Sequence, residues 1–133
     1  MSSQRSIALI DDDEIFQFTT SRIIKLTNLP YTVTQFFNGE QAITYLGQHA
    51  ELADKLPDII LLDINMPVID GWMFLDEFKT LAGKLKKNIT LYMVSSSIAP
   101  EDISRAKTNP LVKDYLVKPV SIETLQDVLK NDS

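Results

Sequence analysis

Short apolar runs alternate along this chain with longer segments in which apolar residues recur at helical spacing. The runs predict five strands, over residues 7–10, 31–36, 58–63, 89–95 and 114–119. The segments that follow them predict five helices, over residues 14–26, 40–56, 71–81, 99–107 and 121–130. Apolar strands in strict alternation with helices are typical of a parallel sheet covered on both faces. We therefore expect a single α/β domain.

Polar residues mark the starts of several predicted helices. Asp13 is expected to cap the first helix rather than to bind a metal, and Ser121 is expected to cap the last. Pro100 and two acidic residues open the fourth helix, where the helix dipole favours negative charge. Asp70 and Gly71 form the cap and turn that begin the third helix.

Two of the predicted helices and one predicted strand have sequence patterns that refine the prediction. Within 14–26, the residues at helical spacing are Ile15, Thr19, Ile23 and Leu26. The segment 40–56 is long for one helix and contains Gly47, where the helix could be broken. The strand over 31–36 alternates and is rich in β-branched residues, which predicts a more exposed strand.

The amino-acid composition excludes some classes of function and disfavours others. Of the 133 residues, 44% are hydrophobic and 23% are charged, a balance typical of a globular domain. There is no cysteine, which excludes disulfides, thiol catalysis and cysteine-bound zinc, and the single histidine, His49, leaves little room for a Ser-His-Asp triad. A formal charge of −5, with no basic cluster beyond residues 84–87, disfavours nucleic acid as a partner. The chain has no apolar run of about 20 residues and no signal-peptide pattern, so we expect a cytoplasmic domain without a membrane partner.

Side chains that can carry chemistry follow four of the predicted strands. They stand at or just after the carboxyl ends, and they are Asp11, Asp12 and Asp13, then Asp63, then Ser95 and Ser96, and finally Lys118. The carboxyl ends of parallel strands share one edge of the sheet, and ligands bind in the crevice there. We therefore expect carboxylates, a hydroxyl and one ammonium group to converge on a small patch.

Such a cluster of carboxylates predicts a bound cation, because like charges repel and partial burial adds a desolvation cost. Lys118 supplies one positive charge, and Mg²⁺ suits the remaining oxygen ligands. A carboxylate beside that metal can attack a phosphoryl group and form an aspartyl-phosphate, with Ser95 and Lys118 contacting the phosphoryl oxygens. The alternative for Asp63 is a structural cap of the turn into Met66 and Pro67.

Four blocks of the sequence resemble the receiver domain of two-component response regulators: ALIDDDE, LLDINMPVIDGW, LYMVSSS and DYLVKP. The resemblance runs from Ile7 to about Lys130. It implies a (βα)5 doubly wound, flavodoxin-like parallel sheet with the strand order 2-1-3-4-5. It also implies a stand-alone, chemotaxis-regulator-like protein, with one receiver domain over residues 1–133, a core over about 6–130 and no output domain.

The resemblance assigns a role to each acidic residue. Asp63 matches the phosphoacceptor, and Asp11 and Asp12 match the acidic pair that holds Mg²⁺ together with it. Asn65 matches the residue whose backbone carbonyl is a further metal ligand. A domain of this kind is a signalling receiver in a phosphorelay, and it catalyses only its own phosphorylation and dephosphorylation.

Three other residues complete the implied switch. Ser95 matches the hydroxyl that follows the phosphoryl group on activation, and Tyr115 matches the aromatic residue that turns inward with it. Lys118, whose peptide bond to Pro119 is usually cis in this family, matches the phosphoryl-binding lysine. The implied donor is a histidine kinase or a histidine phosphotransfer protein. A downstream protein would bind the face formed by the fourth helix, fifth strand and fifth helix, and the domain would be a monomer or a phosphorylation-linked dimer.

The chain departs from the family pattern in three places. Between Leu46 and Pro57 it is several residues longer than is typical, so the second helix or its exit loop is extended. Ser96 stands where Ala or Gly is common, which could narrow access to the phosphoacceptor. Asn65 and Ser97 occupy positions that tune hydrolysis of the acyl phosphate in this family, so its lifetime stays open.

Two other functions remain alternatives. A phosphohydrolase that resembles the haloacid-dehalogenase-like enzymes would carry an acid two residues after the nucleophile, where this chain has Asn65, and it would need a cap domain. A pseudo-receiver that keeps only the fold is disfavoured, because the chain retains every expected site residue: Asp11, Asp12, Asp63, Ser95 and Lys118.

Overall fold

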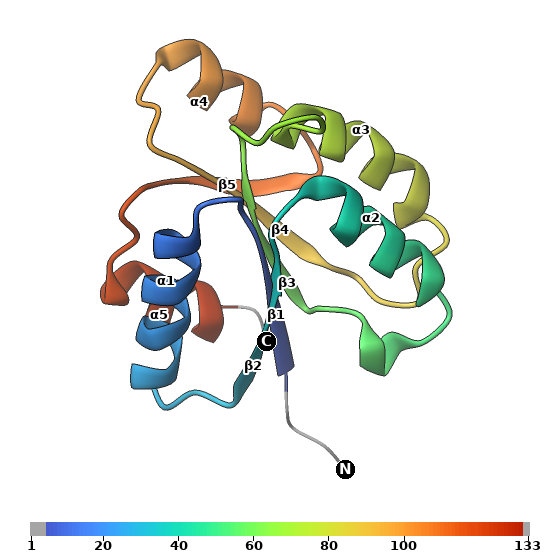
Figure 1. The fold of residues 1–133 in the computed structure, drawn as a ribbon, viewed down its shortest axis with the longest axis horizontal. Helices are drawn as coiled ribbons and strands as arrows, with labels where there is room; N and C mark the ends of the chain where they lie inside the picture. The colour runs from blue at the N-terminus through green and yellow to red at the C-terminus, as the bar shows by residue number, and fades with distance from the viewer. Residues whose placement is uncertain (1–4, 132–133) are drawn as a thin grey trace.

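The computed structural model describes residues 5–131, and Figure 1 shows the course of the chain. The strands are β1 (Arg5–Ile10), β2 (Tyr31–Phe36), β3 (Ile59–Asp63), β4 (Thr90–Ser95) and β5 (Val112–Val117). The helices are α1 (Glu14–Leu26), α2 (Gly39–Gln48), the 3-10 helix η1 (Ala53–Lys55), α3 (Gly71–Ala82), α4 (Pro100–Lys107) and α5 (Ile122–Lys130). The predicted alternation of strands and helices is confirmed over this part of the chain.

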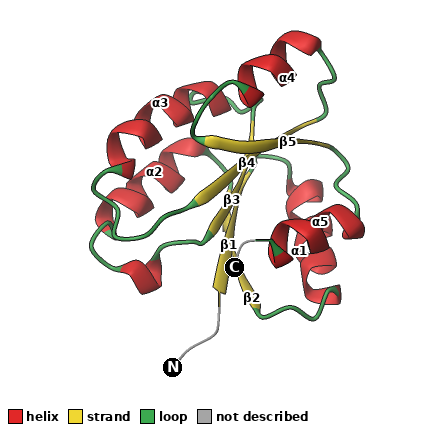
Figure 2. Cartoon of the chain, turned by 180° about the vertical axis from the view of Figure 1, so that it is seen from behind, coloured by secondary structure: helices red, strands yellow, loops and turns green. Residues whose placement is uncertain are grey.

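The five strands form one parallel sheet in the order β2-β1-β3-β4-β5. The helices α1 and α5 cover one face of this sheet, and α2, α3 and α4 cover the other (Figures 1 and 2). The fold class and the strand order expected from the resemblance are confirmed. This topology makes β3 the central strand and leaves β2 at an edge, where alternate side chains of β2 are exposed, as predicted.

Alternate residues of the central strand point to opposite faces of the sheet. Ile60 and Leu62 of β3 pack with residues of α2, α3 and α4, whereas Ile59 and Leu61 pack with residues of α1 and α5. All four side chains are at most 1% exposed. Burial on both faces explains why this strand is a continuous apolar run.

Side chains cap the helices at the predicted positions. Asp13 caps α1, Asp70 caps α3 and Ser121 caps α5. Asn38 also caps α2, which was not predicted. In each case a side-chain oxygen accepts a hydrogen bond from a backbone N–H two or three residues later, at 2.8–3.1 Å. Pro100 is the first residue of α4, as expected.

The boundaries of two predicted strands are wrong by two residues, and β3 and β4 each begin one residue later than predicted. β1 begins at Arg5 and not at residue 7, because its backbone pairing with β2 continues back to Tyr31. β5 spans Val112–Val117 and not 114–119. Lys118 therefore lies in the segment that follows β5, although its backbone N–H still donates to the carbonyl oxygen of Ser95 at 2.9 Å.

The helix predicted over 40–56 is also wrong at its carboxyl end. α2 ends at Gln48, one residue past Gly47, and the chain then passes through η1 before β3. The hydroxyl of Tyr45 holds this exit segment by donating to the carbonyl oxygen of Lys55 at 2.7 Å. The longer segment before Pro57 is thus an exit loop and not an extension of the helix.

The buried face of α1 differs from the stripe that the apolar spacing suggests. Ile15 and Leu26 are 77% and 66% exposed. The buried side chains of α1 are instead Phe16, Gln17, Thr20 and Ile24. The buried stripe starts one residue later, which corresponds to a rotation of about 100° around the helix axis. Two of its members are polar, so a pattern of apolar residues could not identify it.

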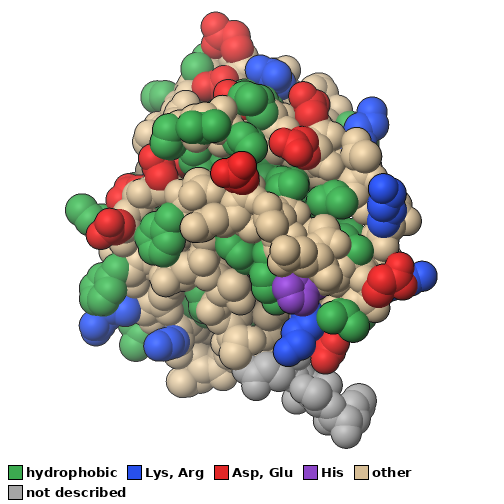
Figure 3. Space-filling model, turned by 45° about the vertical axis from the view of Figure 1, so that its right-hand side comes forward, with side chains coloured by type: hydrophobic (Ala, Val, Ile, Leu, Met, Phe, Trp, Pro, Cys, Tyr) green, Lys and Arg blue, Asp and Glu red, His purple; other side chains and the backbone are tan. Residues whose placement is uncertain are grey.

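The surface carries both signs of charge. Acidic and basic side chains are interspersed over the face shown in Figure 3. Among residues 5–131, no helix has the combined length and apolar character that crossing a bilayer requires.

Candidate functional site

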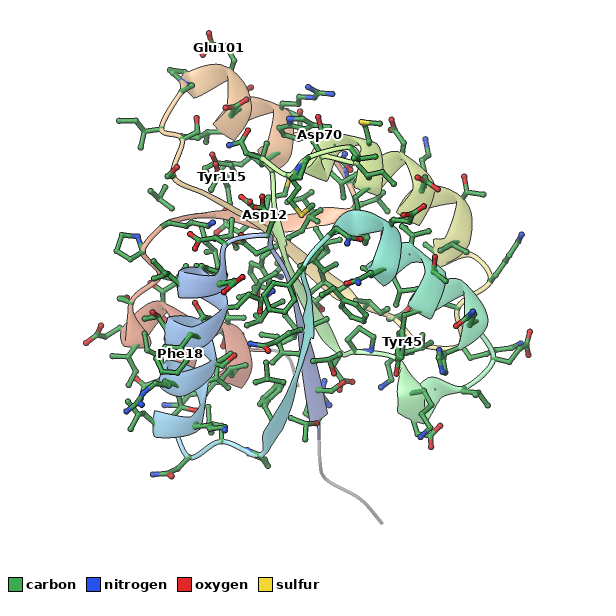
Figure 4. All side chains as sticks on the ribbon, viewed as in Figure 1. Asp12, Phe18, Tyr45, Asp70, Glu101 and Tyr115 are labelled. Atoms are coloured by element: carbon green, nitrogen blue, oxygen red, sulfur yellow. The ribbon has the colours of Figure 1, made fainter. Side chains whose placement is uncertain are left out.

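The carboxyl edge of the sheet gathers three acidic side chains. Asp11 and Asp12 directly follow β1, and Asp63 ends the neighbouring strand β3. One carboxylate oxygen from each of the three residues lies within 4.8 Å of the others. Figure 4 labels Asp12 at this edge, where β1 gives way to the loop before α1. The topology thus brings together the acids that the sequence predicts to meet.

Hydrogen bonds fix the turn that carries the first two acids. The backbone N–H of Asp11 donates to the carbonyl oxygen of Phe36 at 3.0 Å, which extends the pairing of β1 with β2 by one residue. The N–H of Asp13 donates to Oδ1 of Asp11 at 2.9 Å, and Asp13 then caps α1. Asp13 therefore belongs to the turn and the helix cap, as predicted, and Oδ2 of Asp11 contacts Lys118.

Lys118 is the cation of this cluster. Its Nζ lies 2.7 Å from Oδ2 of Asp11 and 3.7 Å from Oδ1 of Asp63. The ammonium group also lies over the ring of Phe16, 4.6 Å from its centroid. The peptide bond between Lys118 and Pro119 is cis, as the resemblance implies.

Burial changes the acidity of the two enclosed carboxylates. It is the main cause that raises the pKa of Asp63 from 3.8 to about 7, and the nearby charge of Asp11 adds to it. The ammonium of Lys118 and a backbone hydrogen bond from Asn65 act in the opposite direction. Burial also raises the pKa of Asp11, against the hydrogen bond from Lys118. One ammonium group therefore does not fully compensate the three carboxylates.

The donor set fits a hard divalent cation. Oδ2 of Asp11 is buried, and apart from its ion pair with Lys118 it receives no hydrogen bond from the described residues. Asp63 is 5% exposed, whereas Asp12 is exposed to solvent. Oxygen ligands that are partly open to water suit Mg²⁺, which retains several water molecules when it binds.

The loop after Asp63 is a tight turn that brings the start of α3 close to the end of β3. Asn65 is exposed in this loop, and the N–H of Gly71 donates to the carbonyl oxygen of Ile64 at 2.8 Å. A Cβ atom on Gly71 would lie 2.6 Å from the carbonyl oxygen of Asp63. The close approach of α3 to the end of β3 therefore requires glycine at this position.

The loop after β4 links the site to α4 and β5. Ser95 is fully buried, and its Oγ accepts a hydrogen bond from the N–H of Ser97 at 3.1 Å. The hydroxyl of Tyr115, which is 8% exposed, donates to the carbonyl oxygen of Ser97 at 2.8 Å. Figure 4 shows Tyr115 between α4 and the edge of the sheet. The two predicted switch residues are thus connected through a residue that lies between them.

A cleft opens beside the acidic cluster. It has a volume of about 420 Å³, and its lining includes Ile15 and Phe16 of α1 together with Ser96, Lys118 and Pro119. Ser96 is exposed at this cleft. The cleft provides a route by which another molecule can reach the region of Lys118.

Several residues at the site were not predicted from the sequence. Phe16 contacts the ammonium group of Lys118, and the Gln17 side chain donates to the carbonyl oxygen of Asp11 at 3.1 Å. Asp102 accepts a hydrogen bond from Oγ of Ser97 at 2.8 Å. For Gln17, the available signal was a polar residue one turn after the cap of α1, on a face that must pack against the sheet.

A doubly wound parallel sheet with an acidic cluster and a lysine at its carboxyl edge defines the receiver class of α/β domains. The chain belongs to the family described as response regulator receiver domain, which matches residues 7–130. The resemblance seen in the sequence is therefore confirmed.

Three similar proteins are informative. A two-component response regulator from Cytophaga hutchinsonii is 32% identical, with a TM-score of 0.86 and 98% of each chain covered. The Mn²⁺-bound form of response regulator Rcp1 is 26% identical, with a TM-score of 0.73, covering 96% of this chain and 88% of that one. The nitrate/nitrite response regulator protein NarL of Escherichia coli K12 is 34% identical over an alignment that covers 97% of this chain but only 56% of NarL.

Proposed function

We propose that this receiver domain is a phosphorylation-dependent switch that accepts a phosphoryl group from a phosphohistidine onto Asp63 with Mg²⁺. The observation that carries the proposal is the place of Asp63 at the end of a buried strand, among Asp11, Asp12 and Lys118. These residues supply oxygen ligands for a divalent cation and an ammonium group for a phosphoryl oxygen. The Mn²⁺-bound form of the similar protein Rcp1 supports the assignment of a divalent cation.

In the proposed transfer, a carboxylate oxygen of Asp63 attacks the phosphorus atom of the donor phosphohistidine. The new P–O bond forms as the P–N bond breaks, and the electron pair of the P–N bond stays on the donor imidazole. Mg²⁺ held by Asp11, Asp12, Asp63 and the carbonyl oxygen of Asn65 would neutralise charge on the phosphoryl oxygens. Asp63 must be ionised to attack, and the nearby cations favour that form.

Lys118 and Ser95 would then hold the phosphoryl group. Lys118 needs only to turn its ammonium group from Asp11 toward the new phosphoryl oxygens, because it already lies 3.7 Å from Asp63. The hydroxyl of Ser95 would donate to a phosphoryl oxygen, and Tyr115 would move with the loop that contains Ser97. This rearrangement would bias a two-state equilibrium at the surface formed by α4, β5 and α5.

Two kinds of partner protein follow from this proposal. The donor would be a histidine kinase or a histidine phosphotransfer protein, and it would approach along α1, where Ile15 is 77% exposed and lines the cleft beside Lys118. The second partner would be a downstream protein that binds the α4–β5–α5 surface. The receiver would act as a monomer or as a dimer linked to phosphorylation.

Acetyl phosphate, a small phosphodonor, provides the test. The protein is incubated with acetyl phosphate and Mg²⁺, and its intact mass is measured. We expect one phosphate adduct per chain, which is lost in Asp63→Asn and kept in Asp54→Asn, a matched change in η1 at an exposed position.

The alternatives predict other results. The absence of an adduct, with acetyl phosphate and with a phosphorylated donor protein, would leave a pseudo-receiver as the better explanation. Multiple turnover of phosphate monoesters would favour a phosphohydrolase. An adduct that persists in Asp63→Asn would assign the phosphate to another residue.

A further inference from the structure

The side chain of Gln17 lies beneath the acidic cluster and is almost completely buried, at 1% exposure. Its Nε2 lies at hydrogen-bond distance from three backbone carbonyl oxygens: 3.0 Å from Leu9, 3.1 Å from Asp11 and 3.0 Å from Phe36. These carbonyls belong to the ends of β1 and β2 and to the residue after β1. One carboxamide group of α1 therefore joins the two strand ends at the point where the acidic turn begins.

Stability alone does not explain the choice of glutamine here. Its Oε1 is buried and receives no hydrogen bond from the described residues. An unpaired buried acceptor is destabilising, and two amide hydrogens must serve three acceptors.

The contact with Asp11 closes a ring of hydrogen bonds around the turn. Oδ1 of Asp11 accepts from the N–H of Asp13, and Asp13 caps α1. The N–H of Gln17 donates to the carbonyl oxygen of Asp13 at 3.0 Å, and the Gln17 side chain returns to the carbonyl oxygen of Asp11. The two peptide groups that flank Asp11 are both held, because its N–H donates to Phe36 while its carbonyl accepts from Gln17.

We propose that Gln17 is a positioning residue for the metal and phosphoryl site, because its carboxamide fixes the peptide groups from which the carboxylates of Asp11 and Asp12 extend toward Asp63. This inference rests on the proposed function, since it concerns the same cation. Groups that orient metal ligands without touching the metal typically change metal affinity about 10-fold to 100-fold when they are removed. A carboxylate held by one turn is sensitive to such a change, because a site needs its ligands placed to within about 0.5 Å.

Gln17→Met tests the inference, because methionine has a similar length and no donor. The Mg²⁺ dissociation constant is measured by following backbone amide resonances of the folded protein during titration with MgCl₂, and the free energy of unfolding is measured in urea. We expect Gln17→Met to weaken Mg²⁺ binding about 10-fold to 100-fold. A matched control is Ile24→Ala, a buried change on the same helix at 1% exposure, which should lower stability without changing Mg²⁺ affinity by more than about two-fold.

The comparison of the two variants distinguishes positioning from packing. Both variants disturb buried contacts of α1, but only Gln17→Met removes the donor that lies between the three carbonyl oxygens. Equal Mg²⁺ affinity in Gln17→Met and Ile24→Ala would overturn the inference.

The wild-type protein supplies a measurement that depends on no variant. Its Gln17 carboxamide protons should be protected from exchange and should shift when Mg²⁺ is added. Carboxamide resonances that stay unchanged while the amides of Asp11 and Asp12 shift would overturn the inference and leave the proposed function intact. Wild-type protein that neither binds Mg²⁺ nor acquires a phosphate would overturn both.

Discussion

The hydroxyl of Tyr115 donates a hydrogen bond to the backbone carbonyl oxygen of Ser97 at 2.8 Å, which ties β5 to the loop between β4 and α4. Ser97 is also held from the helix side, because its Oγ donates to Oδ2 of Asp102 in the first turn of α4. Its N–H donates to Oγ of Ser95. A movement of the Ser95 hydroxyl would therefore break one bond of a series that reaches both α4 and β5.

Tyr115→Phe tests this connection, because it keeps the ring and removes the donor. Loss of one hydrogen bond should lower the free energy of unfolding by about 1 kcal/mol, measured in urea. The amide resonances of α4 should shift as well. Tyr45→Phe is the control, since that hydroxyl donates to Lys55 far from α4. Unchanged α4 resonances in Tyr115→Phe would mean that Ser97 does not transmit the change.

The ionisation of Asp63 should change the stability of the protein between pH 3.8 and about pH 7. Burial and the charge of Asp11 raise its pKa from 3.8 to about 7. The folded protein therefore binds this proton more tightly than the unfolded chain does, so the stabilisation is complete below pH 3.8 and is lost as the pH rises to about 7. The contribution of Asp63 to the free energy of unfolding of the metal-free protein should fall across this window, by at most about 1.4 kcal/mol per pH unit.

Urea denaturation between pH 4 and pH 8 measures this dependence. Asp63→Asn should flatten the decline, because asparagine does not ionise. Mg²⁺ should restore stability at neutral pH, since it binds the folded site and not the unfolded chain. An equally steep decline in Asp63→Asn would assign the titration to another group, such as Asp11, whose pKa is also raised by burial.

Replacement of Lys118 should separate phosphorylation from its consequence. In Lys118→Ala, acetyl phosphate and Mg²⁺ should still produce an adduct at Asp63, at a reduced level, because the metal ligands remain. The phosphorylated variant should show smaller shifts of the α4 and β5 amides than phosphorylated wild type, and weaker binding to the downstream partner. Wild-type shifts and wild-type binding in Lys118→Ala would contradict the role assigned to this lysine.

Gly71→Ala should be strongly destabilising. The added Cβ would lie 2.6 Å from the carbonyl oxygen of Asp63 and 2.8 Å from the Cα of Ile64, so backbone must move. Overpacking of this kind costs about 1–3 kcal/mol, which a urea unfolding curve would detect. Gly83→Ala provides the control, because a Cβ there meets nothing within 4 Å and its backbone is in the helical region. Equal stability of the two variants would show that the end of β3 can relax away from α3.

Val68→Asn should stabilise the protein. Val68 lies in the loop after Asp63 with φ of 67°, a left-handed conformation that is unfavourable for a β-branched residue, and its side chain is 90% exposed. Asparagine tolerates this conformation, so the free energy of unfolding should rise by about 1 kcal/mol. The same replacement at Val117, a strand residue with ordinary φ, should bring no gain. A loss of stability in Val68→Asn would mean that the valine side chain makes a contact that offsets its backbone strain.

The acidic cluster could be predicted from the sequence because its position follows from topology alone. Asp11, Asp63 and Lys118 each stand at the carboxyl end of a predicted strand, and parallel strands end at a shared edge. The packing of α1 could not be predicted in the same way. Its buried face includes Gln17 and Thr20, and the carbonyls that Gln17 binds come together only when β1, β2 and α1 have assembled.

The exit loop after α2 lies at the amino end of β3, whereas Asp63 lies at the carboxyl end of the same strand. The additional residues of this loop therefore lie at the opposite end of β3 from the acidic cluster. Because the chain has no cysteine and Asp54 of η1 is exposed, Asp54→Cys would introduce a single thiol at a position remote from the cluster. A fluorescent dye attached to that thiol would report binding of a kinase or a downstream protein through its anisotropy, without occupying the edge at which the phosphoryl group would arrive.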